Sequence, residues 1–459
     1  MGRQGAYKAA PTPFAAQRPL VMKFARLFST SSLLSLARVA GAVAGFGTQI
    51  VLARTLQASA LGVFYSVTSL AAVVGLIAAH GYPSIAARFM LRYRKQGREG
   101  LVAAFVQRSR HDVTVYAAIA TAAVLAFALL WPSFSSEVRL ALVAAALSIP
   151  ANASFRLNGT FANTIRRFAL AYLPDTCIRP FLLLGGIGLL LALGMTLTAS
   201  SVTFLLTLIL ASLALTQYAL LAKDMPKGNA APSPRRLLTL WRREATPLIL
   251  VALITNFFAD VAILMVTPLL SSADTASIGI CLKLALLVGF AVQVAHQVVV
   301  PDLANARARK DRESIRLAGL RALVFPLAST LAATVVAALW GKSILALFGP
   351  EFTGAKAALV ILIGCQLLRA VFGPSVALLT VIGAQKENAA LAVLALVALG
   401  GADLALAPSY GVLGAAAGVA IATLVWVVGC AVVLYRLSGL RIDAPYLIGQ
   451  LMAVRSAPA

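Results

Sequence analysis

The stretch from Gly411 to Leu434, GVLGAAAGVAIATLVWVVGCAVVL, contains no charged residue. It is long enough to cross the hydrocarbon core of a bilayer as a helix, which takes about 20 residues. The rest of the 459-residue chain has the same character, since 60% of its residues are hydrophobic, 12% are charged and the mean hydropathy is +0.90. A soluble domain has about 45–50% apolar and about 25% charged residues. The composition therefore predicts an integral membrane protein and excludes a soluble globular one.

Apolar runs of membrane-spanning length recur along the whole chain. Backbone amides in lipid must be hydrogen-bonded within their own segment, so each run is expected to be a helix. The runs cover residues 32–53, 62–83, 113–131, 138–155, 170–193, 200–222, 246–269, 276–299, 322–340, 357–382, 389–407 and 411–434. The predicted fold class is an all-α integral membrane fold with twelve transmembrane helices.

The 39 Lys and Arg residues are distributed unevenly between the two sides of these spans. With the N-terminus inside, 31 lie in inner segments, 4 in outer loops and 4 within spans. Positive residues collect in cytoplasmic loops, so the count predicts an N-in and C-in protein with both termini cytoplasmic. The basic, acid-free residues 1–31 also have the composition of an organellar transit peptide. We expect them to be a cytoplasmic tail, and Met22 is an alternative start.

A Pro- and Gly-containing inner linker, residues 223–245, divides six spans from six. A weak repeat relates the two halves, because Gly62 and Gly279 begin the second and eighth spans and His80 and His296 follow 18 and 17 residues later. Paired lobes are common in transporters. We expect a basic tail at 1–31, a six-helix lobe at 32–222, the linker at 223–245, a second six-helix lobe at 246–435 and a tail at 436–459.

Short motifs occur in a fixed order along most of the chain. They are Arg38-Val39-Ala40-Gly41, Val51-Leu52-Ala53-Arg54-Thr55-Leu56, Ala60-Leu61-Gly62-Val63-Phe64, Asp260 with Ala276-Ser277-Ile278-Gly279, Leu347-Phe348-Gly349-Pro350-Glu351-Phe352 and Pro408-Ser409-Tyr410-Gly411-Val412-Leu413-Gly414-Ala415-Ala416. Together they resemble the oligosaccharide flippases of O-antigen and exopolysaccharide repeat units. These form the polysaccharide-transport branch of the multidrug/oligosaccharidyl-lipid/polysaccharide flippase superfamily.

The resemblance implies a multi-pass transporter of the bacterial cytoplasmic (inner) membrane. It would flip an undecaprenyl-diphosphate-linked oligosaccharide to the outer leaflet for surface polysaccharide biosynthesis, such as that of lipopolysaccharide or exopolysaccharide. The implied partners are the phospholipid membrane and the polysaccharide polymerase machinery.

Positive residues inside the spans are the first candidates for substrate binding, because an ionisable group at mid-bilayer costs about 2.5–3.5 kcal/mol. Arg38, Gly41, Gly45 and Gln49 fall on one helical face. This face is either a cavity wall that receives a phosphate or a glycine packing face with Arg38 reaching the interface.

Two further spans carry substrate-binding candidates. Lys283, Gln293 and Gln297 share a face of the eighth span, where a positive charge and amides would suit a phosphate and sugar hydroxyls. Arg369 lies deep in the tenth span, and its guanidinium can bind a phosphate through two donors.

Asp260, His80 and His296 are candidates for coupling or gating. Asp260 is either a proton or cation site or the ion-pair partner of Lys283 or Arg369. A histidine can change charge near pH 6.5, but it can equally be a hydrogen-bonded packing residue. Asp175 and Arg179 are four residues apart, which favours an intrahelical ion pair over a functional role.

Catalytic and metal-binding signals are lacking in the sequence. The four cysteines lie in apolar runs without metal-ligand spacing, so no metal and no cofactor are expected. No Asp-x-Asp motif occurs and the outer loops are short, which disfavours a membrane glycosyltransferase or ligase. We expect no enzyme and no nucleic-acid partner. A cation-coupled drug exporter or a peptidoglycan-precursor flippase of the same superfamily remains an alternative.

Overall fold

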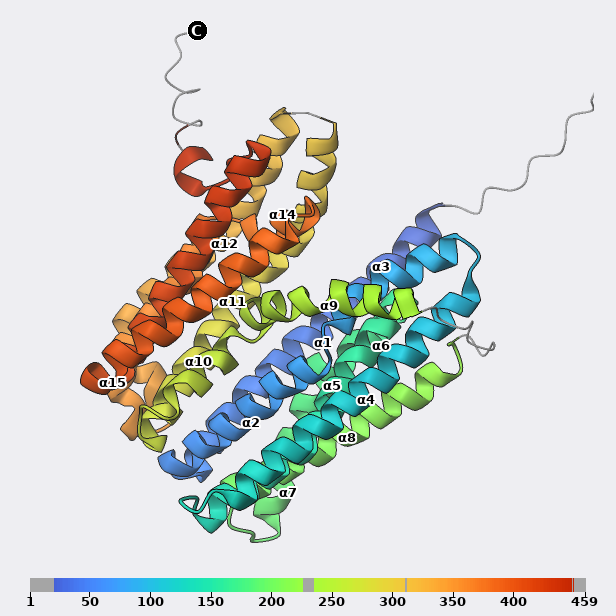
Figure 1. Ribbon diagram of the computed structural model, residues 1–459. Helices are drawn as coiled ribbons and strands as arrows, with labels where there is room; N and C mark the ends of the chain where they lie inside the picture. Colours follow the sequence, from blue (N-terminus) through green and yellow to red (C-terminus); the bar gives the residue numbers. More distant parts are fainter. Residues whose placement is uncertain (1–19, 226–234, 310–311, 448, 450–459) are drawn as a thin grey trace, which may run out of the picture.

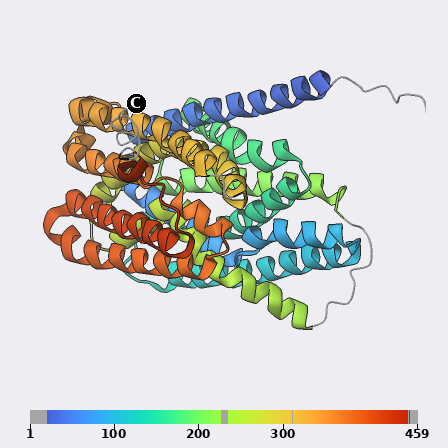
Figure 2. The ribbon, with the colours of Figure 1, turned by 90° about the horizontal axis from the view of Figure 1, so that it is seen from above.

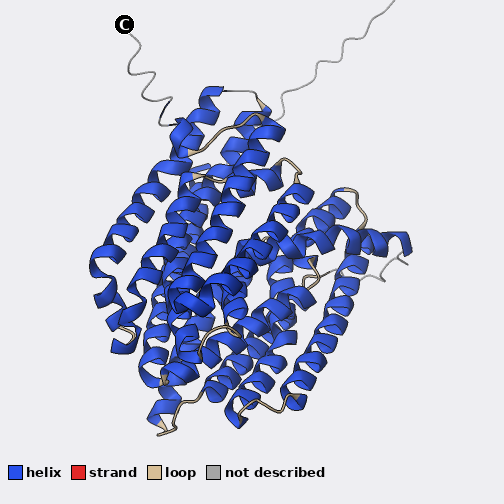
Figure 3. Cartoon of the chain, turned by 60° about the vertical axis from the view of Figure 1, so that its left-hand side comes forward, coloured by secondary structure: helices blue, strands red, loops and turns tan. Residues whose placement is uncertain are grey.

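The computed structural model describes residues 20–225, 235–309, 312–447 and 449. These residues form helices and connecting turns, with no strand among them (Figure 3). The first group of helices comprises α1 (Leu20–Thr55), α2 (Ala58–Ala78), α3 (Tyr82–Lys95), α4 (Glu99–Leu130), α5 (Ser136–Thr164), α6 (Phe168–Leu173), α7 (Arg179–Ala192) and α8 (Ala199–Ala222). The second comprises α9 (Arg235–Asn256), α10 (Phe258–Val266), α11 (Ser272–Ala308), α12 (Arg312–Ala346), α13 (Lys356–Val371), α14 (Ser375–Val381) and α15 (Gln385–Ser438).

Helix α5 is the centre of the first group and packs against α2, α4 and α8 (Figure 1). Its start is fixed by Ser135, whose hydroxyl accepts a hydrogen bond from the Val138 amide and so satisfies one of the free N–H groups at a helix start. A single π-helical turn at Pro174–Ile178 joins α6 to α7. Two prolines border this segment, Pro174 and Pro180, and a proline cannot donate the backbone hydrogen bond of a regular helix interior.

Helix α15 turns back on itself within the second group. Gly411 has φ 57° and ψ −133°, a conformation that glycine adopts readily and that interrupts the helix. Before and after this point the two arms lie against each other, since Cys430 contacts Asn388 and Gly418 lies beside Asp403. The motif Pro408–Ala416 therefore forms the turn between two antiparallel arms.

The described chain fits a multi-pass membrane protein. Ten described helices are long and apolar enough to cross a membrane, and an eleventh results when the bent pair α9 and α10 is taken as one span. This confirms the all-helical membrane fold. The two arms of α15 were expected as separate spans, and the count of twelve stays a prediction, as does the side of the membrane on which the termini lie.

The two groups meet mainly where α2 packs against α10 and α11 (Figure 1). Seen from above, the orange-to-red helices of the second group lie on one side and the cyan helices of the first group on the other (Figure 2). The repeated motif glycines lie in this seam. Gly62 of α2 lies against the backbone of Ser272, and Gly279 of α11 lies beneath the ring of Tyr65. A side chain at either position would overlap the opposite helix, so small residues allow the close approach. The relation is reciprocal, because each group contributes one glycine.

Candidate functional site

A break between α9 and α10 sets the geometry of the candidate site. The two helices differ in direction by 82° on either side of Phe257. Asn256, the last residue of α9, lines cavities in both groups of helices. The sequence does not predict this break, since neither glycine nor proline occurs between Ile254 and Phe258.

The cavity on the side of the first group, called the N-side cavity below, has a volume of about 470 Å³. A second hollow of about 300 Å³ shares Asn152, Arg156 and Asn256 with it and is included in the name. Polar and charged side chains of the larger space come from α1, α2, α5, the π-helical turn, α7, α8, α9, α10 and α11. These residues are Gln49, Thr68, Ser148, Asn152, Arg156, Asp175, Arg179, Thr203, Thr207, Asn256, Asp260 and Lys283.

Two of the three cations in the N-side cavity are paired with carboxylates. Arg179 Nη1 lies 3.0 Å from Asp175 Oδ1, one turn away along the helix, so the favoured intrahelical pair is present. Lys283 Nζ lies 3.8 Å from Asp260 Oδ1, and Ser69 donates a hydrogen bond of 2.9 Å to the same oxygen. Of the alternatives open for Asp260, the structure shows pairing with Lys283.

Arg156 is the third cation of the N-side cavity, and no carboxylate lies within ion-pair distance of it among the described residues. Its guanidinium lies 4.0 Å from the ring centroid of Phe257, and its buried Nε has no described hydrogen-bond partner. The predicted span ends at residue 155, so the sequence predicts that Arg156 lies in an inner loop. That placement is wrong, since α5 continues to Thr164.

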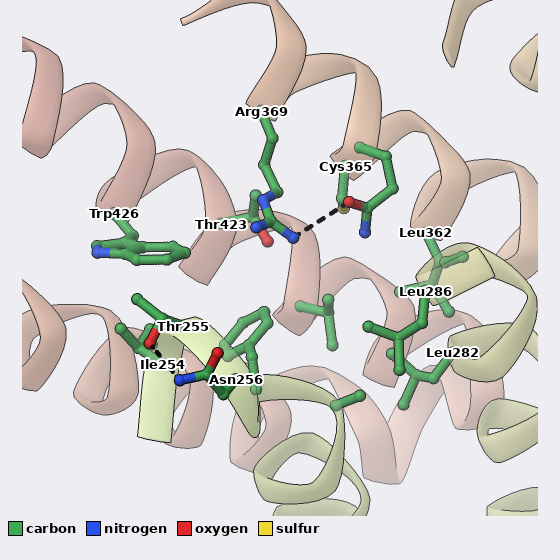
Figure 4. Close-up of a pocket in the computed structure, with 15 residues that line it drawn as sticks. Ile254, Thr255, Asn256, Leu282, Leu286, Leu362, Cys365, Arg369, Thr423 and Trp426 are labelled. Carbon is green, nitrogen blue, oxygen red and sulfur yellow. Dashed lines mark hydrogen bonds between the residues drawn. The ribbon is translucent and has the colours of Figure 1, made fainter. Parts of the chain in front are cut away.

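The cavity on the side of the second group, called the C-side cavity below, has a volume of about 460 Å³. Arg369 of α13, Gln293 and His296 of α11, and Asn256 line it. A smaller adjoining pocket, drawn in Figure 4, is also lined by Arg369 and Asn256. Arg369 donates a hydrogen bond of 3.2 Å to Gln366 Oε1, and no described carboxylate pairs with it.

The predicted candidates do not all meet in one place. Gln49, Lys283 and Asp260 line the N-side cavity, while Gln293, His296 and Arg369 line the C-side cavity. The two sets are linked through Asn256 at the break. Gln49 accepts a hydrogen bond of 2.7 Å from Tyr65. The side chain of Gln297 lies outside the described part of the structure.

Arg38 lines none of the described cavities, contrary to the cavity-wall interpretation of its helical face. Its guanidinium lies 4.7 Å from the ring centroid of Tyr172, which itself lines the N-side cavity. Gly41 lies against the backbone of Thr176, and Gly45 faces Pro180. This part of the face is therefore a packing surface for the turn before α7, while Gln49 further along does reach the cavity.

His80 and His296 do not occupy equivalent local structures. His80 has a φ of 50° in the turn between α2 and α3, its ring centroid lies 4.9 Å from that of Tyr116, and its Nε2 lies 3.3 Å from the Thr246 hydroxyl. His296 lies inside the continuous helix α11, and its buried Nε2 has no described partner. The weak sequence repeat is therefore not matched by structure at this point, because a turn between α2 and α3 holds His80 whereas α11 continues through His296.

A cluster of polar contacts, called the clasp below, joins the first group to α9. The Asp112 side chain is 3% exposed and accepts hydrogen bonds of 3.0 and 2.9 Å from Arg242 and of 2.6 Å from Tyr82. Arg108 lies 3.0 Å from the same carboxylate. Asp112 was missed because hydropathy treats it as the edge of a span. Residues 235–245 were expected in the linker at 223–245, but they belong to α9.

Outside the Asp112 contacts, two further interactions fix α9 to α3. Trp241 donates a hydrogen bond of 3.0 Å to the Tyr93 hydroxyl, and Arg88 forms an ion pair with Glu244. Among the residues that the structure describes, no group of three or more His, Cys, Asp or Glu side chains could hold a metal ion.

Solved structures of transporters share this architecture. The lipid II flippase MurJ in an inward closed conformation superposes with a TM-score of 0.68 at 14% identity, over 93% of each chain. A multidrug resistance MATE family transporter of the MOP superfamily, in an inward-facing conformation, gives 0.63 at 16% identity over 89% of this chain and 95% of that one. A MATE transporter in complex with MaL6 gives 0.58 at 16% identity over 90% and 97%.

No protein-family profile and no curated protein sequence matches the chain. The class defined by the structure is thus a multi-pass membrane protein with the fold of MOP-superfamily transporters and flippases. The all-helical membrane fold is the one that the sequence resemblance implies. At 14–16% identity the likeness establishes the fold and leaves the oligosaccharide-flippase branch to be argued from the site.

Proposed function

We propose that the chain flips an undecaprenyl-diphosphate-linked oligosaccharide from the inner to the outer leaflet of the bacterial cytoplasmic membrane for surface polysaccharide biosynthesis. The proposal rests on Arg156 and Arg369, which line the two cavities without a carboxylate partner among the described residues. Unpaired cations in a membrane interior are costly. A diphosphate supplies the missing negative charge, and each guanidinium can bind a phosphate through two parallel donors.

The remaining lining of the N-side cavity suits the sugar part of such a substrate. Gln49, Ser148, Asn152 and Thr207 present amides and hydroxyls to the space. Sugar hydroxyls both donate and accept hydrogen bonds, as these side chains do. A polyprenyl tail would stay in lipid while the head enters between the two groups of helices.

We further propose that residues 32–222 and 246–435 act as two lobes that rock against each other, with both termini in the cytoplasm. On this view, the Asp112–Arg242 clasp closes the cytoplasmic end and must open before a substrate enters. Outward movement of a negative head is assisted by an inside-negative potential, by about 2.3 kcal/mol per charge per 100 mV. Asp260, His80 and His296 stay proposed coupling or gating residues, and of these Asp260 would act by exchanging its Lys283 partner for an ion.

A peptidoglycan-precursor flippase is the second candidate function. The observation that favours it is the superposition on a lipid II flippase with a TM-score of 0.68. Lipid-linked saccharides of both kinds would meet the same cations. The sequence motifs favour the oligosaccharide, and the superposition alone favours the precursor.

We first test ligand binding by the purified protein and then the phenotype of a deletion strain. Purified protein is titrated with undecaprenyl diphosphate and, separately, with uncharged undecaprenol, and the combined Arg156→Gln and Arg369→Gln variant is compared with wild type. We expect saturable binding of the diphosphate only, weakened more than about tenfold in the variant. The matched control combines Arg98→Gln and Arg236→Gln, which removes two exposed charges that line no described cavity. Equal binding of undecaprenol, or equal weakening in the control, would contradict the proposal.

A strain deleted for the gene then separates the two candidate functions. Loss of surface polysaccharide with intact peptidoglycan synthesis supports the oligosaccharide substrate, when the wild-type gene restores it and the double variant at equal protein level does not. Arrest of peptidoglycan synthesis in the deletion strain supports the second candidate instead.

A further inference from the structure

A groove on the outer face of the first group of helices contains a positive charge that the proposed transport does not use. Helices α4 and α8 both pack against α5, which forms the floor, and the groove between them has a volume of about 440 Å³. Of its lining residues, Leu147, Leu215 and Tyr218 are 48%, 69% and 50% exposed. Such apolar, exposed side chains on a membrane-spanning bundle face lipid.

The groove is separate from the N-side and C-side cavities. It shares no lining residue with them, because α5 turns one stripe toward the groove and another toward the N-side cavity. Leu147, Ala151 and Ser154 lie on the first stripe, and Ser148 and Asn152 lie on the second. A ligand in the groove is therefore not the head of a transported substrate.

Arg110 of α4 lies at one end of the groove. Its guanidinium carbon lies 4.5 Å from the ring centroid of Tyr218 and 5.8 Å from that of Phe161. Two of its nitrogens, Nε and Nη2, are buried and have no hydrogen-bond partner among the described residues. The rings hold the guanidinium in place, but buried donors without acceptors cost free energy. An anionic oxygen would relieve that cost.

The polarity of the groove changes along its length. Arg110, Asn158 and Tyr218 lie at the end of the groove nearer the start of α4. Leu147, Pro150 and Ala211 continue toward the middle of the helices. From Asn158 to Leu147 the helix rises about 16 Å. This gradient matches a lipid whose phosphate lies at the interface and whose acyl chain runs inward.

We propose that this groove binds an anionic glycerophospholipid of the surrounding leaflet, with Arg110 on its phosphodiester and the acyl chain between α4 and α8. Basic pockets between transmembrane helices recognise anionic lipid heads in this way. The lipid is a resident one that fastens α4 and α8 to α5. The inference stands independently of the proposed transport function.

Thermal unfolding of the purified protein in mild detergent, with added phosphatidylglycerol or phosphatidylcholine, tests the proposal. Phosphatidylglycerol stabilises wild type at lower concentration than phosphatidylcholine. Arg110→Gln raises the half-saturating phosphatidylglycerol concentration at least about tenfold. Ala151→Phe keeps the charge, fills the apolar end and weakens binding likewise. The matched control is Arg98→Gln, which removes an exposed charge near the start of the same helix and leaves the stabilisation unchanged.

Three results would overturn the proposal. In the first, the two phospholipids stabilise wild type equally. In the second, Arg98→Gln lowers the response as much as Arg110→Gln, so that only overall charge matters. In the third, Arg110→Gln weakens binding of undecaprenyl diphosphate and leaves the phosphatidylglycerol response intact, which assigns the groove to the substrate. If Arg110→Gln does not fold, Ala151→Phe decides the question, because it leaves Arg110 untouched and should still weaken the phosphatidylglycerol response. Arg110→Lys, which keeps the charge, should retain most of that response.

Discussion

The two cavities beside Asn256 differ in how their charges are balanced. The N-side cavity holds three cations and two carboxylates, and two of the cations are paired. The C-side cavity holds one cation, Arg369, with the neutral partner Gln366 and no carboxylate in its described lining. In its described lining, each cavity therefore presents one unpaired guanidinium, in the first after two ion pairs have formed and in the second because no carboxylate is present. The capacity of a cavity to bind an anion thus depends on the number of its cations without a partner and not on its total number of charges.

The largest effect is expected when Arg156 of the N-side cavity is replaced. Arg156 is the unpaired cation in the described lining of the N-side cavity. Arg156→Gln is therefore expected to lower flipping by about ten- to a hundredfold, the free energy of a hydrogen bond to a charged group. Flipping is measured in proteoliposomes at equal protein content. The control is Arg139→Gln on the same helix, which lines no described cavity. Unchanged flipping in Arg156→Gln would remove this residue from the site.

Arg369→Gln tests the other side and is expected to cost about tenfold, because Gln366 already shares its donors. Its combination with Arg156→Gln tells whether both cations act on one ligand. Groups that bind the same head are expected to show a coupling energy of about 0.5–3 kcal/mol in the double-mutant cycle. Strictly additive losses would indicate two separate binding events. Arg369→Lys keeps the charge and should retain more flipping than Arg369→Gln.

A third test leaves both cavities intact and removes the contact between Arg242 of α9 and Asp112 of α4. Arg242→Gln takes away two donors from the buried Asp112, but Tyr82 and Arg108 still contact the carboxylate. We expect about 1–3 kcal/mol lower stability in thermal unfolding at fixed detergent. Arg88→Gln, whose partner Glu244 is more exposed, should cost about 1 kcal/mol or less. An equal cost for both variants would contradict a special role of the buried carboxylate.

The smallest effect is expected at the paired cation of the N-side cavity. Lys283 and Asp260 are partly exposed, at 33% and 20%, so Lys283→Gln should cost about 1 kcal/mol or less. Adding Asp260→Asn should restore most of it, because the variant then has no unpaired carboxylate. Thermal unfolding of the two single variants and the double variant measures the pair. A double variant that is less stable than either single one would show that the two residues do not act as a pair.

The helices could be predicted from sequence because hydropathy and backbone hydrogen bonding act on long segments. Most of the predicted runs lie inside helices of the structure, and the Asp175–Arg179 and Asp260–Lys283 pairs were among the interpretations weighed. Arg156 was misplaced because a charged residue ends an apolar run, although the helix continues beyond it. Burial against Phe257 is a tertiary contact that no local pattern reports.

Two other features could not be predicted for different reasons. The face shared by Arg38, Gly41 and Gln49 was correctly recognised by its helical spacing, but spacing cannot tell which neighbour covers it. The 82° break after Asn256 occurs without proline or glycine, so it depends on packing between the two groups of helices. Site residues drawn from several helices become visible only once those helices are assembled.

The reciprocal glycine contacts restrict how the halves can move. Tyr65 over Gly279 and Ser272 against Gly62 interlock, so sliding along the seam would force side chains into backbone. If the two groups move as the proposed lobes, tilting about this point is the freer motion, and α2 then acts as a rigid arm. The arm from Gly62 to His80 is about 27 Å, so a tilt of about 10° moves its far end by about 5 Å. That displacement exceeds the 3.3 Å between His80 Nε2 and the Thr246 hydroxyl. In the proposed motion, a small rotation at the glycine seam would therefore separate α9 from the far end of α2.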